Sequence, residues 1–178
     1  RVELGLGVGW MKEEFDALGV PWEKRGARND EYIEAMRALW QGPHAEYHGD
    51  FVDFEPATCS PRPVNGSIPI IVGGDSDAAI SRAVRIADGY FPGEGDIAQL
   101  GALLNRVRQA AEAAGRDPAS IEFSAIFGSQ MANPEQGVEE MASIGVDRIM
   151  VPAFFFGGPE GLDHLDQLSE RIMPIANG

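Results

Sequence analysis

The feature that most constrains the fold is a regular alternation of short apolar runs with segments of helical spacing. Each apolar run is followed by one or two helical segments, and the runs are residues 2–8, 68–72, 88–92, 121–127 and 147–152. Strands this apolar have no solvent-facing side, which is typical of a parallel sheet covered by helices. The sequence therefore predicts an α/β fold built from five strand–helix units.

Capping signals and apolar periodicity place the helices. The expected helices are 12–18, 29–41, 77–87, 97–114, 134–144 and a last one from 159 onward. Gly42 is expected at the C′ position of the second helix. In the last helix we expect Leu162, Leu165, Leu168 and Ile172 to point inward. Residues 43–67 are predicted to be an excursion within the domain, with a hairpin over 44–55 centred on His48-Gly49-Asp50.

A sequence motif that occurs twice favours a barrel of repeated units over an open sheet. Residues 87–92 and 146–152 both run from aspartate through an apolar strand to proline. A complete eight-unit barrel needs about 250 residues, so five units in 178 residues predict the C-terminal part of a TIM-type (β/α)8 barrel. We expect residues 1–178 to be a single, partial domain. The chain starts at Arg1 rather than methionine, and truncation, proteolysis and an incomplete gene record are all open explanations.

Charge and composition exclude several function classes. The net charge is −14 and the pI is about 4.5, so nucleic acids and anionic membranes are repelled. No apolar run approaches the roughly 20 residues that span a bilayer. Cys59 is the single cysteine, which excludes an internal disulfide. With no leader pattern, a reducing cytoplasm is the expected compartment.

Two strand–helix junctions can carry a ligand, because ligands of parallel α/β folds bind where strands end. The first comprises Gly7, Val8, Gly9 and Trp10. Its glycines let a ligand approach bare backbone, and Trp10 can wall an aromatic ring. The alternative is a close turn with a packed tryptophan, which glycine spacing alone favours.

The second junction comprises Val72, Gly73, Gly74, Asp75 and Ser76. Two glycines expose backbone amides just before a helix, whose positive end favours a phosphate. The alternative is a plain N-cap, in which Asp75 or Ser76 binds the first-turn amides. From the residues alone, both interpretations stay open.

No complete catalytic constellation is present, and no catalytic acid or base is assigned. His44 and His48 are four residues apart, but the nearby glycines and proline argue against a helix that would pair them on zinc. No metal site is expected. The run 154–158 (FFFGG) follows a strand end, where it can line a pocket mouth or pack in the core.

Taken together, these motifs resemble the bacterial luciferase-like monooxygenase family, and most closely its F-420-dependent oxidoreductase branch. The segments that carry the resemblance are 1–10 (RVELGLGVGW), 13–15 (EEF), 18–21 (LGVP), 25–32 (RGARNDEY), 39–40 (LW), 47–51 (YHGDF), 61–64 (PRPV), 69–74 (PIIVGG) and 87–90 (ADGY). The resemblance covers essentially the whole chain. It implies a TIM-type barrel that binds a flavin or deazaflavin at its C-terminal mouth.

The resemblance also assigns roles. Gly7 to Trp10 would approach the isoalloxazine-like ring, and Gly73 to Ser76 would hold the phosphate-bearing tail. Many flavin-using relatives carry an arginine where Val8 stands, which tilts the expected cofactor from FMN toward F-420. Relatives that oxidise sugar phosphates carry a glutamate where Trp10 stands, which disfavours that substrate. The family's early strands, which supply catalytic residues, have no counterpart here.

These observations predict an oxidoreductase that passes hydride between a small organic substrate and F-420. The alternatives are an FMN-dependent monooxygenase that uses O2, and a non-catalytic partial barrel that binds a cofactor or forms oligomers. Five strands leave two open sheet edges, so a homo-oligomer, most simply a dimer, is expected. A fragment without the early strands should show little or no turnover.

Overall fold

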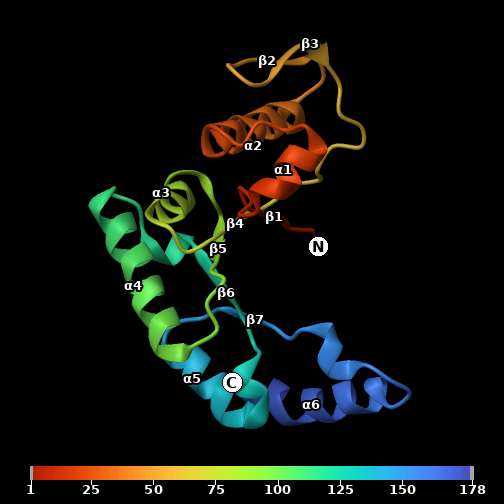
Figure 1. Ribbon diagram of the computed structural model, residues 1–178, viewed down its shortest axis with the longest axis vertical. Helices are drawn as coiled ribbons and strands as arrows, with labels where there is room; N and C mark the ends of the chain where they lie inside the picture. Colours follow the sequence, from red (N-terminus) through yellow and green to blue (C-terminus); the bar gives the residue numbers. More distant parts are fainter. Residues whose placement is uncertain (1, 177–178) are drawn as a thin grey trace. The chain divides into compact units, whose positions relative to one another are not determined.

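The computed structural model describes residues 2–176 (Figure 1). The chain divides into two compact units, with the boundary between Ile70 and Ile71. Unit 1 holds the first strand, two helices and a hairpin, and unit 2 holds the remaining strand–helix alternation. Each unit is described by itself. None of the helices in the described part of the chain is long and apolar enough to cross a membrane.

Unit 1 contains five regular elements, which are β1 (Leu4–Leu6), α1 (Lys12–Leu18), α2 (Arg25–Gln41), β2 (Ala45–His48) and β3 (Asp53–Ala57). The amide of Leu4 in β1 donates to the carbonyl of Pro69, at 2.9 Å. Helix α1 has the predicted bounds and ends at Gly19, whose φ of 67° lies in the left-handed region. The hairpin predicted over 44–55 is confirmed, because β2 and β3 pair antiparallel.

Helix α2 differs from its prediction at its N-terminus. It begins at Arg25, four residues before the expected start, and it ends at Gln41 as predicted. Gly42 follows the helix with an extended backbone, φ −175°, rather than the left-handed conformation that is common at C′. The chain leaves the helix directly toward Pro43, and an extended residue is what a following proline favours. Ile33 and Trp40 of this helix are buried, whereas Tyr32 is 47% exposed.

Unit 2 repeats strand and helix along the chain. Its elements are β4 (Ile70–Gly73), α3 (Asp77–Ile86), β5 (Gly89–Phe91), α4 (Ile97–Ala113), η1 (Pro118–Ser120), β6 (Glu122–Ile126), η2 (Ser129–Ala132), α5 (Pro134–Ser143), β7 (Arg148–Met150), η3 (Ala153–Phe156) and α6 (Gly161–Ala176). The strands run in the order β4-β5-β6-β7, and each neighbouring pair is parallel. These four strand–helix units, together with β1 and the helices that follow it in unit 1, confirm the predicted five. All carboxyl ends of β4 to β7 consequently meet at one edge.

The core of unit 2 lies between this sheet and its helices. Tyr90 of β5 is fully buried, and α4 buries an apolar stripe of Leu100, Leu103, Leu104, Val107 and Ala111. Helix α6 departs from the prediction. It buries Leu168 and Ile172, whereas Leu162 is 78% and Leu165 is 42% exposed. Leu168 and Ile172 are one turn apart on α6, the helix that packs against α5.

The last strand also departs from the expectation that no strand has a solvent face. Arg148 and Met150 of β7 are exposed. Strand β7 stands at the end of the sheet order, so β6 is its neighbour on one side. Phe154, just after β7, is 77% exposed, and the core-packing interpretation of the run 154–158 is therefore wrong for this residue.

Candidate functional site

The segment Gly7 to Trp10 follows β1 and presents open backbone beside an exposed indole. Trp10 is 82% exposed, so the interpretation of a packed tryptophan is wrong. Gly9 has φ of 78°, and a Cβ there would lie 2.5 Å from the Phe15 ring. A Cβ at Gly7 would meet nothing within 4 Å. Packing against Phe15 thus accounts for the glycine at position 9, while the backbone at Gly7 stays approachable.

The turn between β4 and α3 combines an unusual backbone with a helix N-terminus. Gly74 has φ of 113°, a conformation that side chains other than glycine's rarely adopt. The Ser76 hydroxyl accepts the amide of Ala79 at 3.2 Å, which confirms the N-cap interpretation. The first helical hydrogen bond runs from Ile80 to the Ser76 carbonyl. The amides of Asp77 and Ala78 precede that bond, at the positions where helix N-termini bind anions.

Asp75 supports this turn rather than extending from it. Its carboxylate accepts the amide of Gly93 at 2.8 Å and so ties the turn to the loop after β5. The Tyr90 hydroxyl, from the buried face of β5, donates to the Gly74 carbonyl at 2.7 Å. Burial raises the pKa of Tyr90, and the nearby Asp75 raises it further. The phenol therefore stays protonated and keeps its role as a donor to the turn.

Arg106 brings a positive charge to the same place, and the sequence reasoning missed it. It lies on α4 and forms an ion pair with Asp77, the first residue of α3. It also lines a hollow of about 310 Å³ together with Asp75, Glu94 and Gln99. A signal existed in the sequence, because helices that follow neighbouring parallel strands pack side by side. A long basic side chain on the second helix can then reach the start of the first.

Gln130 joins the next two loops along the same edge of the sheet. Its side-chain amide donates to the Gly95 carbonyl at 3.1 Å, and its side-chain oxygen accepts the Gly128 amide at 3.2 Å. Gln130 is only 7% exposed. A Cβ on Gly137 of α5 would lie 2.5 Å from the Gln130 Cβ, so the glycine makes room for the glutamine. Through Asp75 and Gln130, the loops after β4, β5 and β6 are connected.

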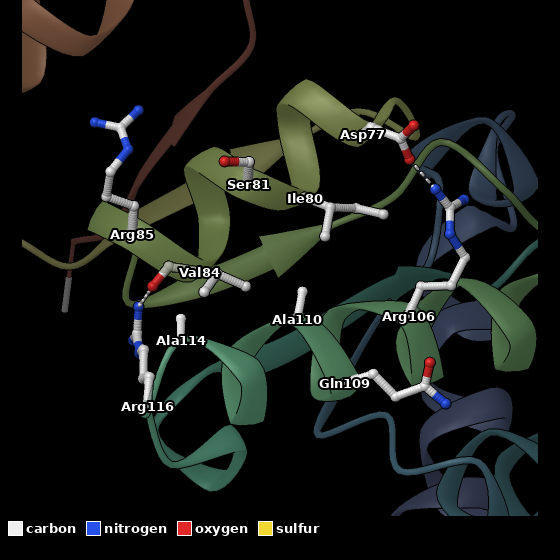
Figure 2. Close-up of a pocket in the computed structure, with 10 residues that line it drawn as sticks. All are labelled: Asp77, Ile80, Ser81, Val84, Arg85, Arg106, Gln109, Ala110, Ala114 and Arg116. Carbon is white, nitrogen blue, oxygen red and sulfur yellow. Dashed lines mark hydrogen bonds and ion pairs between the residues drawn. The ribbon is translucent and has the colours of Figure 1, made fainter.

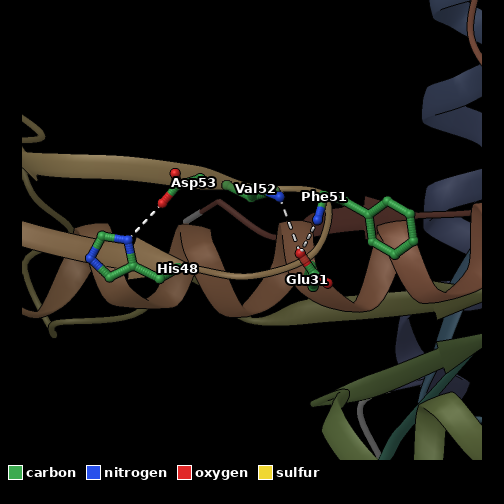
Figure 3. A network of polar contacts seen from close by, with 5 residues as sticks. All are labelled: Glu31, His48, Phe51, Val52 and Asp53. Carbon is green, nitrogen blue, oxygen red and sulfur yellow. Dashed lines mark hydrogen bonds and ion pairs between the residues drawn. The ribbon is translucent and has the colours of Figure 1, made fainter.

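In unit 1, Glu31 fastens the hairpin to α2 (Figure 3). Its carboxylate accepts three consecutive amides of the turn, from Asp50, Phe51 and Val52, at 3.0, 2.7 and 3.1 Å. Desolvation raises the pKa of Glu31, but the three amide hydrogen bonds outweigh it and lower the pKa. A Cβ at Gly49 would overlap the carboxylate. This contact explains why a glutamate and a glycine stand at these positions.

The hairpin also carries His48, one of the two histidines considered above as a zinc pair. His48 Nδ1 lies 2.6 Å from an Asp53 carboxylate oxygen across the two strands. This hydrogen bond raises the pKa of His48. His44, with φ of 59°, lies just before β2. Within residues 2–176, no group of three or more histidine, cysteine, aspartate or glutamate side chains is placed to hold a metal ion.

The two predicted groups of site residues fall in different units. Gly7 to Trp10 lie in unit 1, and Gly73 to Ser76 lie in unit 2. Val72 is buried in β4, the strand that leads into the turn. Unit 2 thus defines a parallel α/β protein with a glycine turn, a helix N-terminus and an arginine at the carboxyl edge of its sheet. The chain belongs to the luciferase-like monooxygenase family, whose model matches residues 1–170.

Curated relatives share this sequence over part of their length. An uncharacterized protein of Mycobacterium tuberculosis is 40% identical over 152 residues, which cover 85% of this chain and 51% of that protein. The FMNH(2)-dependent dimethylsulfone monooxygenase of Pseudomonas putida is 34% identical over 119 residues, covering 65% of this chain and 33% of that protein. The chain therefore spans about half the length of the first of these relatives and a third of the second.

Solved structures share the fold. The coenzyme F-420-dependent tetrahydromethanopterin reductase of Methanopyrus kandleri matches with a TM-score of 0.74 at 17% identity, over 97% of this chain and 73% of that one. A monooxygenase of Streptomyces bottropensis matches with a TM-score of 0.74 at 21% identity, over 98% of this chain and 68% of that one. The predicted α/β fold with a parallel sheet, forming part of a luciferase-like barrel, is confirmed.

Proposed function

We propose that this chain is the cofactor-tail part of an oxidoreductase that passes hydride between a small organic substrate and F-420. The observation that carries the proposal is the β4–α3 turn. There, the glycine backbone at Gly74, the first amides of α3 and the Arg106 guanidinium lie together. This combination fits a phosphate ester, since amides and a guanidinium both donate to its oxygens.

The two carboxylates at the turn leave room for such an anion. Asp75 is engaged by the Gly93 amide, and Asp77 by Arg106. The N-cap hydrogen bond of α3 comes from Ser76 rather than from either carboxylate. Gly73 and Gly74 would approach the tail through their backbone, while Val72, buried in β4, anchors the turn. In unit 1, Gly7, Val8, Gly9 and Trp10 would contact the ring.

When bound, F-420 supplies a carbon that accepts or donates hydride, and the protein contributes binding and orientation. Support for F-420 over FMN comes from Val8, at the position where many flavin-using relatives carry an arginine. No residue of the chain is assigned as acid or base in the transfer. The contribution of these residues to catalysis is therefore the positioning of cofactor and substrate.

A second candidate is an FMN-dependent monooxygenase, in which reduced FMN activates O2. The relative from Pseudomonas putida, at 34% identity, is named as an FMNH(2)-dependent enzyme, which favours this candidate. Both candidates place a phosphate-bearing tail at the same turn. They differ in the ring system and in the groups attached beyond the phosphate.

Separate equilibrium titrations with F-420 and with FMN, monitored by cofactor fluorescence, test the proposal. The expected result is saturable binding of F-420 with a dissociation constant at least tenfold below that of FMN. The reverse order would establish the FMN candidate. If neither cofactor binds, the proposed function is wrong.

A further inference from the structure

We propose that the groove between α3 and α4 is the binding site for the oligoglutamate extension of F-420. This inference rests on the proposed function and deepens it. Beyond its phosphate, F-420 carries a lactyl group and a chain of γ-linked glutamates, whereas FMN ends at the phosphate. A protein that selects F-420 can therefore gain affinity from cations placed beyond the phosphate site. The groove offers such cations.

The groove has a volume of about 920 Å³ and is lined by residues of α3, α4 and the turn that follows α4 (Figure 2). Arg85, Arg106 and Arg116 all contribute to it, and Asp77 is the one acidic residue among the described residues of its lining. This local surplus of two positive charges stands against a net charge of −14 for the whole chain. A polyanion repelled elsewhere on the chain meets an attractive potential here.

The floor of the groove is apolar and suits the methylene groups of a glutamyl chain. Ile80 and Val84 of α3 are 5% and 7% exposed, and Ala110 and Ala114 lie opposite them on the α4 side (Figure 2). Small residues on that side keep the floor open. A γ-linked glutamate presents two methylenes to such a surface and its carboxylate to the flanking arginines.

Arg106 connects the groove with the proposed phosphate site. It lines both the groove and the hollow that contains Asp75. Its partner Asp77 has a side chain that is 93% exposed, so the ion pair is solvated and weak enough to open. The carboxylate of a glutamate that follows the phosphate along the tail would compete with Asp77 for the Arg106 guanidinium.

At the other end of the groove, Arg116 is a fixed charge. Its guanidinium donates to the carbonyls of Ala83, Val84 and Ala87 at 3.2, 2.9 and 2.8 Å, and so closes the C-terminus of α3. Arg116 therefore contributes a positive electrostatic potential to the groove rather than a hydrogen bond to the tail. Arg85 projects from the last turn of α3 near this end (Figure 2).

The length of the groove matches a short tail. Asp77 and Arg85 are eight residues apart on α3, which corresponds to roughly 12 Å of helix at about 1.5 Å per residue. A γ-linked glutamate spans roughly 6 Å, because two methylenes lengthen the roughly 3.5 Å of an ordinary residue. The groove accordingly takes about two glutamates, and glutamates beyond these should add little.

The test compares F-420 that carries no glutamate with F-420 that carries two and five. Titration of the full chain should show affinity that rises about fivefold to twentyfold from none to two glutamates and then levels off. The gain should shrink in 0.5 M NaCl, since exposed charges are screened. Arg85→Gln, which removes one of the three arginines of the lining, should reduce the gain without changing affinity for the tail-free form. Arg171→Gln is the control. It removes the same charge from α6, where Arg171 forms an ion pair with Glu135 of α5.

A second variant tests the connecting role of Arg106. Asp77→Asn releases the guanidinium and should raise affinity for the two-glutamate form by twofold or more. Affinity that is independent of tail length would overturn the groove assignment while leaving the proposed function intact. If a free oligoglutamate peptide binds the groove although the tail adds nothing to the affinity for F-420, the groove is a peptide site. That result would also overturn the groove assignment. Absence of any F-420 binding would overturn both proposals.

Discussion

Replacing Gln130 with leucine tests whether the loops at the carboxyl edge of the sheet are held by this one side chain. The change keeps the size of a buried residue but removes its hydrogen bonds to the Gly95 carbonyl and the Gly128 amide. Each such bond contributes about 1 kcal/mol, and an unpaired buried group costs more. Gly95 is half-buried, so water recovers part of the loss. The expected cost is about 1–2 kcal/mol of unfolding free energy.

Two assays measure this cost. With a urea slope of about 2 kcal/mol/M, the midpoint of the far-UV circular dichroism transition should fall by about 0.5–1 M. Hydrogen exchange of residues 93–96 should accelerate by roughly fivefold to thirtyfold, as the same free energy requires. Gln136→Leu is the control, because this glutamine is exposed on α5, and its cost should stay below about 0.5 kcal/mol. Equal effects of the two variants, or unchanged exchange in 93–96, would refute the reasoning.

Three further predictions concern single contacts. Glu31→Gln should accelerate amide exchange in the hairpin turn at neutral pH. In the wild-type protein the pKa of Glu31 is lowered, so its contribution to stability is lost only as the pH falls below 4.5 and through the folded-state pKa, and the turn should loosen there. Identical pH profiles of exchange in the wild type and the variant would contradict this. By NMR, the pKa of His48 should lie above its usual 6.5, because the hydrogen bond to Asp53 favours the charged ring. Its contribution to stability is present below pH 6.5 and is lost as the pH rises through the raised pKa. Asp53→Asn should lower this pKa, and an unmoved value would contradict the pairing. Tyr90→Phe should cost about 1 kcal/mol by urea unfolding, since it removes the hydrogen bond to the Gly74 carbonyl, and a cost near zero would show that this bond is not needed.

Much of the fold could be predicted from the sequence because local signals and tertiary packing agree. The Ser76 cap, the apolar stripe of α4 and the glycine after α1 each specify an element by themselves. Leu162 and Leu165 show where this fails. A periodic apolar pattern identifies a helix, but the burial of each apolar residue depends on neighbouring elements that periodicity does not describe.

The candidate site was predictable only in its backbone. Glycines at a strand end and a hydroxyl before a helix are local patterns; Gly74 has a positive φ, and Ser76 caps α3. The side chains that surround the turn come from elsewhere in the chain. Arg106 follows Asp77 by 29 residues, and Gln130 reaches Gly95 across 35. Such contacts depend on how helices and loops pack over the sheet, which the spacing of residues does not encode.

The central claim is that the β4–α3 turn binds the phosphate of a flavin-type cofactor. The most direct measurement is the ratio of dissociation constants for phosphate-bearing and phosphate-free forms, FMN against riboflavin and F-420 against its phosphate-free deazaflavin. We expect the phosphate to strengthen binding at least tenfold, and Gly74→Ala to reduce that ratio toward one. Gly158→Ala, which places a side chain at φ of 94° where a Cβ meets nothing within 4 Å, should leave the ratio unchanged. Equal affinities for both forms, or a ratio that survives Gly74→Ala, would contradict the claim.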